Sequence, residues 1–351
     1  MGSGALSQLF LGAEFEAALG GGSTDIGSTA AIEAFLNSSI KPMHADEGIA
    51  EVTGYHPQKD STRVGLATGG DLSGPVGATL LAWMLKMVFM KAPTPTGAGD
   101  PYALVWADPL TPNSGTALFT PQTMPEESFS IIEQVGRITN YGVSPKGLIG
   151  LSLSITWSGS GKVTATLNVA GNGVIATSVA APSGALMSDH GRYLLGSMTG
   201  LTIGGVNVST ALRGGTLTIT PGMAFTDRCG STAGEKTAID QASDPNVDLT
   251  FDLDETALAA EGGLTEYLNA AGAPYGAALP NVYVLTFNGD ANRQVEFTIH
   301  AGKVEGEYPV AIGDKGPLGV QRKVKAYCDA TNWYQYLDVT AKSKYDLSES
   351  V

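Results

Sequence analysis

The sequence contains the same short structural plan twice: an alternating strand, an acidic cap and an amphipathic helix. The copies read VGLATGGDLSGPVGATLLAWML at 64–85 and VDLTFDLDETALAAEGGLTEYL at 247–268, with a constant offset of 183 residues (247 − 64). The offset aligns apolar and acidic positions in order: Val64 with Val247, Leu66 with Leu249, Asp71 with Asp254, Leu81 with Leu264 and Leu85 with Leu268. Repeated units usually each build one element of a larger array. The repeat therefore favours assembly over a single catalytic cleft.

The composition indicates a β-rich protein with a substantial core. The chain has 351 residues, enough for two domains or one large one. Its hydrophobic content of 43% is ample for a core. Glycine accounts for 46 residues, scattered among Ser, Thr, Ala and Val. That scatter is typical of many turns between short strands.

Charge is sparse and its balance is acidic. Charged residues make up 15% of the chain, whereas ordinary globular proteins have about 25%. A low charged fraction indicates that much surface is buried against partners. The net charge of −14 opposes tight nucleic-acid binding, which needs Lys and Arg to displace counterions. It suits a surface that must not hold DNA.

The chain divides into an arm and two modules. Residues 1–46 form an arm that is either loosely ordered or docked on a neighbour, with a short helix expected at Ile26–Leu36. The first module spans 47–210 and contains an inserted excursion at 91–127, rich in Pro, Thr and Gly. The second module spans 211–351. The gap between helix and next strand is much longer in the first module, which marks the excursion as an insertion.

Hydrophobic alternation predicts a mainly β fold, a β-sandwich with one flanking helix per module. The strands are expected at 49–52, 63–67, 102–106, 128–134, 148–157, 163–169, 216–220, 247–253, 282–287, 295–300, 320–328 and 333–340. Residues 151–157 alternate strictly, so the odd positions should face the core. The alternating Thr, Ser and Lys residues of 163–169 and 320–328 predict strands with one wet face.

Two helices are expected. The first begins at Ser73-Gly74-Pro75, with Ser73 as N-cap and Pro75 in the first turn. Its apolar stripe comprises Leu72, Val76, Leu80, Trp83, Met84 and Met87. The second helix spans Glu255–Ala270 and is capped by Asp254.

No motif in the sequence carries catalytic chemistry. The P-loop, the G-x-G-x-x-G turn and the G-x-S-x-G elbow are absent, and Gly69-Gly70-Asp71 is interpreted as a turn and cap. Ser188, Asp189 and His190 are adjacent in sequence, which is not how a triad is arranged. We therefore expect no enzyme activity and no catalytic residues.

Metal and cofactor sites are not expected either. The four histidines, His44, His56, His190 and His300, lack metal-binding spacing, and His300 should be a partly buried polar residue. The acidic cluster of Asp248, Asp252, Asp254 and Glu255 lacks the glycine and glutamate positions of a calcium loop. It is interpreted as an acidic strand face leading into a helix N-terminus, where negative charge is favoured.

The remaining features point to a soluble protein made in the cytoplasm. Cys229 and Cys328 form no disulfide framework, and whether they pair stays open. Trp333, Tyr334 and Tyr336 are expected to pack in strands rather than to stack on bases. The sequence shows neither a signal peptide nor the roughly 18 apolar residues of a membrane span.

The order of these features resembles that of the major tail tube proteins of long-tailed bacteriophages. The resemblance rests on the Arg63-Val64 strand, the Gly70-Asp71-Leu72-Ser73-Gly74-Pro75 run before an apolar helix, the strand at 128–134, and Gly147–Leu153 leading into a hairpin. The second module repeats the pattern and ends in Val339-Thr340-Ala341. It departs from the pattern at Gly262-Gly263, which interrupts its helix.

The resemblance implies a structural role in the virion tail. In that family six β-sandwich modules close into a ring whose inner strands form a continuous barrel, and rings stack through an N-terminal arm and a long loop. Two modules per chain then imply a homotrimer, a pseudo-hexameric ring. Residues 1–46 and 91–127 become the candidates for stacking, and an acidic lumen would let viral DNA slide through during ejection.

The resemblance also implies partners. They are further copies of the chain, other tail proteins (tape measure, terminator and distal tail) and DNA bound without specificity, with no membrane and with assembly in the host bacterial cytoplasm. Two alternatives stay open. One is another virion component, such as a terminator, baseplate or decoration protein. The other is a carbohydrate-binding or hydrolytic fibre module, which should show paired carboxylates in an aromatic groove.

Overall fold

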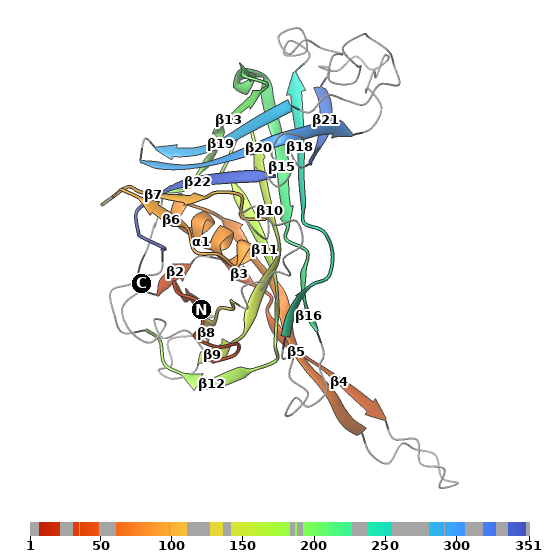
Figure 1. Cartoon of the computed structure of the whole chain (residues 1–351). Helices are drawn as coiled ribbons and strands as arrows, with labels where there is room; N and C mark the ends of the chain where they lie inside the picture. Colours follow the sequence, from red (N-terminus) through yellow and green to blue (C-terminus); the bar gives the residue numbers. More distant parts are fainter. Residues whose placement is uncertain are drawn as a thin grey trace, which may run out of the picture.

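The computed structural model describes most of the chain, and the statements below concern these residues. They are 7–21, 31–34, 36–48, 61–97, 99–110, 127–135, 142–182, 187, 192–226, 238–254, 281–290, 292–305, 319–327 and 336–348. Within them the fold is mainly β with one α-helix, α1 (Ala78–Phe89), and a short 3-10 turn, η1 (Ser209–Ala211) (Figure 1). The predicted mainly β fold is confirmed, and the arrangement in two tandem modules stays a prediction.

One long antiparallel sheet dominates the molecule. Its order is β14 (Val206–Asn207), β13 (Leu195–Ile203), β19 (Asn281–Asp290), β20 (Arg293–Glu305), β21 (Gly319–Ala326), β18 (Asn246–Asp254), β15 (Leu212–Thr220), β10 (Leu148–Ser158), β11 (Thr164–Gly171), β5 (Ser61–Pro75) and β3 (Asn37–Ser38). Four strands join off this path: β4 (Lys41–Gly48) on β5, β22 (Leu337–Ser343) on β20, β7 (Tyr102–Trp106) on β22, and β6 (Thr94–Thr96) on β7.

A smaller five-stranded sheet lies below α1 in Figure 1. Its order is β12 (Ile175–Val179), β9 (Gly142–Pro145), β8 (Ile131–Val135), β1 (Ser7–Leu11) and β2 (Ile32–Ala34). A separate ribbon pairs β16 (Met223–Thr226) with β17 (Ala238–Gln241). β1 and β2 belong to the predicted arm, so the described parts of that segment are hydrogen-bonded within the chain.

Alternation of apolar and polar residues builds the long sheet, as expected. In β18 the side chains of Val247, Leu249, Phe251 and Leu253 are fully buried, while the residues between them are partly exposed. The predicted strands are found wherever they fall on described residues, although β8 begins at Ile131 rather than at 128. Strand 49–52 lies outside the described residues.

The prediction that the odd-numbered residues of β10 face the core is confirmed beyond a β-bulge and is wrong at the bulge itself. Leu153, Ile155 and Trp157 are buried as predicted. Between Gly150 and Ser152 the register with β11 shifts. The bulge redirects Leu151, which packs in a second cluster formed by Met90, Ile149, Met223 and Ile239.

The predicted start of the first helix is wrong. β5 extends to Pro75, and α1 begins at Ala78 with Gly77 as N-cap. Ser73 pairs with Thr166 of β11, so the ladder holds this segment extended despite its helix-start signal. The apolar stripe is also wider than expected, because nearly every residue of α1 is buried.

A glycine lets α1 lie close to the sheet. A Cβ at Gly150 of β10 would stand 2.8 Å from the Cα of Val88 in α1. Any larger residue there would push the helix away, because real Cβ atoms do not approach backbone that closely.

The helix expected at Ile26–Leu36 is also wrong where it can be compared. Ile32–Ala34 form the strand β2, which pairs with β1. The second predicted helix, Cys229, Cys328, His56, His190 and residues 333–335 lie outside the described residues.

Candidate assembly surfaces

The long sheet has a polar face whose hydroxyl groups lie in rows across the strands. One row crosses β11, β10, β15 and β18 through Thr164, Thr156, Thr216 and Thr250, each residue directly opposite the next. The Oγ1 atoms of Thr156 and Thr216 lie 3.4 Å apart. On β21 the row ends at Lys323. The wet face predicted for 163–169 is confirmed, because Thr164 and Thr166 are exposed and the alternate residues are buried.

A second row runs parallel to the first. It comprises Ser73, Thr166, Ser154, Thr218, Asp248 and Lys325, from β5 to β21. Both rows present uncharged hydroxyls on β11, β10 and β15. The second row becomes charged on β18, at Asp248, and the first row becomes charged one strand later, at Lys323 of β21.

β18 supplies the acidic part of this face. Asp248, Asp252 and Asp254 occupy its partly exposed positions, which confirms the predicted acidic strand face. Asn246 donates from Nδ2 to Asp248 Oδ2 at 2.6 Å, and Arg213 forms an ion pair with Asp254. Among the described residues no group of three or more His, Cys, Asp or Glu side chains could hold a metal ion.

Lysines follow on the neighbouring strands. Lys303 of β20 lies directly opposite Lys325 of β21, and Glu305 lies opposite Lys323. The Nζ of Lys323 is 3.2 Å from Oε2 of Glu305. This hydrogen bond, followed by the charge of Asp248, raises the pKa of Lys323. Lys323 is exposed, so the wet face predicted for β21 is also confirmed.

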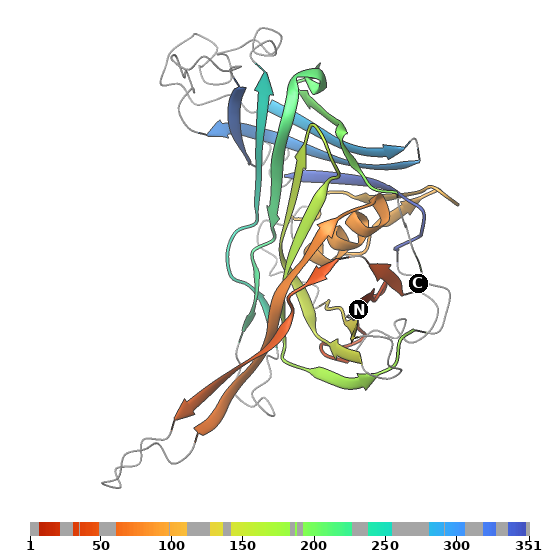
Figure 2. The same cartoon turned by 180° about the vertical axis from the view of Figure 1, so that it is seen from behind.

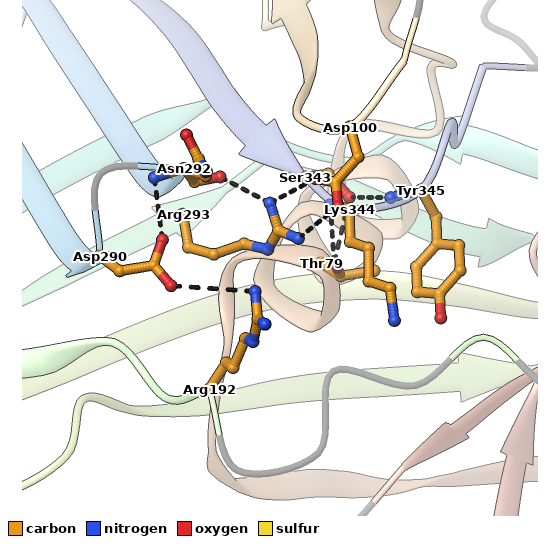
Figure 3. A network of polar contacts seen from close by, with 9 residues as sticks. All are labelled: Thr79, Asp100, Arg192, Asp290, Asn292, Arg293, Ser343, Lys344 and Tyr345. Atoms are coloured by element: carbon orange, nitrogen blue, oxygen red, sulfur yellow. Dashed lines mark hydrogen bonds and ion pairs between the residues drawn. The ribbon is translucent and has the colours of Figure 1, made fainter.

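A bidentate ion pair ties the excursion to the second half of the chain (Figure 3). Arg293 of β20 is 1% exposed, and its NH1 and NH2 donate to Oδ1 and Oδ2 of Asp100 at 2.7 and 3.1 Å. The hydrogen bond to Arg293 lowers the pKa of Asp100. Nearby, Ser343 Oγ donates to Oγ1 of Thr79 at 3.1 Å, which joins the end of β22 to the start of α1.

The strand ladder reinforces this connection. β7 pairs with β22 over five residue pairs, from Tyr102–Ser343 to Trp106–Val339. The described part of the excursion therefore makes contacts inside the chain. A stacking role for the rest of 91–127 stays a prediction.

His300 is a partly buried polar residue, as expected. Its Nε2 lies 2.8 Å from Oδ2 of Asp338, and its side chain is 21% exposed. Asp338 Oδ1 also accepts a hydrogen bond from the backbone N–H of Asp108 at 2.8 Å. His44 lies in β4. Among the described residues, no other histidine lies beside His300 and Asp338.

The predicted turn and cap at Gly69-Gly70-Asp71 is wrong, because all three residues lie inside β5. Asp71 accepts a hydrogen bond from Nδ2 of Asn168 on β11 at 2.7 Å. Gly70 has a φ of 154°, and a Cβ there would lie 2.6 Å from the carbonyl oxygen of Ser39. The glycine is therefore explained by close backbone approach.

The buried charged residues Glu16, Lys86, Arg293 and Arg322 were missed by sequence reasoning, and two of them, Lys86 and Glu16, bind backbone groups. The Nζ of Lys86 in α1 donates to the carbonyl oxygens of Ala13 at 2.8 Å and Leu347 at 3.0 Å, and so connects both ends of the described chain to the helix. The carboxylate of Glu16 accepts from the backbone N–H of Gly147 and Gly20 and from Ser128 Oγ. All their partners named here except Gly20 are distant in sequence, so no local signal marks the burial of Lys86 and Glu16.

The described residues thus define a mainly β protein whose most extensive surface feature is a polar sheet face with rows of hydroxyl and charged groups. No described helix has the length and hydropathy needed to span a membrane. The family model described as phage tail tube protein matches residues 47–298, more than half of the chain. The chain therefore belongs to the phage tail tube protein family, and its role is that of a structural component of a viral tail. No curated protein matches the sequence.

Proposed function

We propose that this chain is the building block of a tail tube, with two homologous units per chain that assemble into stacked rings around a lumen for DNA. The observation that carries the proposal is a strand order that occurs twice. The five-stranded sheet runs β12-β9-β8-β1-β2, and the second half contains β22-β20-β19-β13-β14 in matching chain positions. Every pairing in both series is antiparallel.

The long sheet repeats in the same way. The order β4-β5-β11-β10 is followed directly by β15-β18-β21-β20. In this correspondence β9 and β10 together match β20, which pairs with β19 and β22 near its start and with β21 near its end. Each unit would then begin with its own leading strand, β1 or β13. This arrangement places unit starts before the predicted boundaries at 47 and 211.

Repeated units that join head to tail close into a ring when the rotation between them allows it. Within the chain the joint between units is the pairing of β10 with β15. The equivalent joint between copies would pair β20 with β4 of the next chain. With two units per chain, three chains give the pseudo-hexameric ring.

The polar face is the natural lining of such a tube. Among the side chains that the structure describes on β5, β11, β10, β15 and β18, the charged ones are four carboxylates, Asp71, Asp248, Asp252 and Asp254, and one guanidinium, Arg213. This excess of negative charge would keep phosphates from binding, so DNA could pass during ejection. Assembly in the host cytoplasm and contacts with tape measure, terminator and distal tail proteins belong to the same proposal.

The stacking contact between rings needs a projecting element. The β4–β5 ribbon extends away from the body in both views (Figures 1 and 2). The described parts of both segments considered for stacking, 1–46 and 91–127, include strands that pair inside the chain. The geometry therefore favours the part of this ribbon that does not pair with β20 of the next chain as the stacking element, alongside the rest of those segments.

Electron microscopy of the purified full chain tests this function. The expected result is stacked rings with three chains each and a sixfold pattern of units. Single particles that never form rings would overturn the proposal. Rings of six chains would overturn the two-unit part of it alone.

A further inference from the structure

We propose that the joint between copies is charged, with Lys303, Lys323 and Lys325 of one chain facing the acidic strand β4 of the next. This inference rests on the proposed ring. It adds the chemistry that selects the partner strand. The partner is a second copy of this chain.

Lys303, Lys323 and Lys325 form a patch with more positive than negative charge among the described residues. Lys303 and Lys325 lie directly opposite each other on adjacent strands, an arrangement of like charges that destabilises a sheet. Glu305 is paired with Lys323, and Asp248 lies on the far side of Lys325. Among the described residues, the three ammonium groups exceed the two carboxylates beside them. The Nζ of Lys303 lies 5.2 Å from the ring centroid of Tyr327, which is a cation–π contact and not an ion pair.

Lys303 lies on β20, the strand proposed to form the joint, and Lys323 and Lys325 lie on β21, the next strand of the sheet. Lys303 and Glu305 lie on the last part of β20, which pairs with β21 on one side. β4 pairs with β5 on one side, and among the described residues no strand is paired to its other edge. By sequence β4 carries Lys41 at its start and Asp46 and Glu47 near its end, which gives a net charge of −1 (+1 − 2) with His44 neutral.

The joint inside the chain shows a contrasting chemistry. Where β10 meets β15, the facing polar pairs are Thr156 with Thr216 and Ser154 with Thr218, and none of these side chains is charged. A covalently connected joint needs no charge to select its partner. A joint between separate chains gains specificity and association rate from complementary charge.

A second copy fits this patch better than DNA does. Tight DNA binding needs many Lys and Arg residues without acidic neighbours. Here Asp248 and Glu305 lie next to the lysines, so the net charge of the patch is small. A short acidic strand matches a patch of this size and charge.

Charge reversal tests the inference with the full chain. Lys303→Glu with Lys325→Glu should raise the protein concentration needed for rings at least about tenfold, and Asp46→Lys with Glu47→Lys should do the same. The four substitutions together should restore ring formation. Sedimentation velocity and negative-stain microscopy at several salt concentrations give the readout. Lys342→Glu, on β22 away from the joint, is the matched control and should assemble like the wild type.

The outcomes separate the two proposals. If the wild type forms no rings, the tube function falls and the joint with it. If rings form but charge reversal changes neither their threshold nor their salt dependence, the charged joint alone is wrong. If the reversed variants form normal rings and lose only weak binding to duplex DNA, the lysines contact DNA, which also overturns the inference. Circular dichroism checks folding, and Lys303→Gln with Lys325→Gln, expected to weaken assembly less, replaces any variant that fails to fold.

Discussion

The two five-strand series of the chain share one order and differ at one edge. In the second series β22 is covered by β7, a strand from the excursion in the first half. In the first series β12 has no second strand beside it among the described residues. β12 is short, and its register shifts between Thr177 and Val179, where Ser178 has a φ of 60°. Bulges of this kind blunt an exposed edge.

The difference shows what the excursion does for the fold. The segment 91–127 supplies a strand, a buried tryptophan and an ion pair that connect the first half of the chain to the second. Trp106, Asp100 and Asp108 all lie in the excursion, and each contacts β20, β22 or α1. The connection between halves of one chain is thus reinforced, whereas a connection between chains would depend on strand pairing and charge.

The largest effect is expected from removing the buried side chain of Trp106 in β7. Trp106 is fully buried, its Nε1 donates to the carbonyl of Lys91, and its ring packs against Phe89. Trp106→Ala should lower the free energy of unfolding by about 3–5 kcal/mol, because a large cavity is left. Val105→Ala, on the other face of β7, should cost less than about 1.5 kcal/mol. If urea unfolding gave the two variants equal losses in the free energy of unfolding, the packing of Trp106 would not be what holds β7 on the second series.

The sequence predicts the strands of the long sheet better than the strands at its margins. β10 and β18 keep a period of two over many residues, which only a half-buried strand explains. β1 is a short apolar run that periodicity cannot distinguish from helix, and β13 contains glycines that break the pattern. Both were therefore missed, although they hold matching places in the two series.

The misassigned helix start and the missed buried charges have a common cause. Ser73-Gly74-Pro75 carries a local helix-start signal, but its pairing with β11 decides the outcome. Lys86 and Glu16 look like surface residues by type, and only contacts with distant backbone groups explain their burial. The polar rows were partly predictable, because alternation marks the wet residues. Their alignment across five strands depends on register, which sequence alone does not determine.

A medium effect is expected from Glu16, whose buried carboxylate connects segments next to the first series. The carboxylate of Glu16 accepts hydrogen bonds from three groups, the backbone N–H of Gly147, the backbone N–H of Gly20 and the hydroxyl of Ser128. Glu16→Gln replaces one acceptor by a donor, so at least one buried group loses its partner. We expect a loss of about 1–3 kcal/mol in the free energy of unfolding.

A matched variant sharpens this test. Glu296→Gln makes the same chemical change on the partly exposed face of β20, where Thr286 donates to the carboxylate. It should change the free energy of unfolding by less than about 0.5 kcal/mol. If both variants behave alike in urea unfolding, Glu16 does not anchor the first series.

The smallest effect is expected at the ion pair of the second series, and it depends on pH. The hydrogen bond from Arg293 lowers the pKa of Asp100 from its ordinary value of 3.8. A carboxyl whose pKa is lower in the folded state adds stability above the unfolded pKa, and this stability is lost as the pH falls through the folded pKa. Asp100→Asn should therefore lower Tm slightly at pH 7, and the difference from the wild type should shrink as the pH falls below about 4. Thermal unfolding from pH 7 to pH 3 measures this. A difference that stays constant over that range would mean that the pair of Asp100 and Arg293 contributes through packing rather than charge.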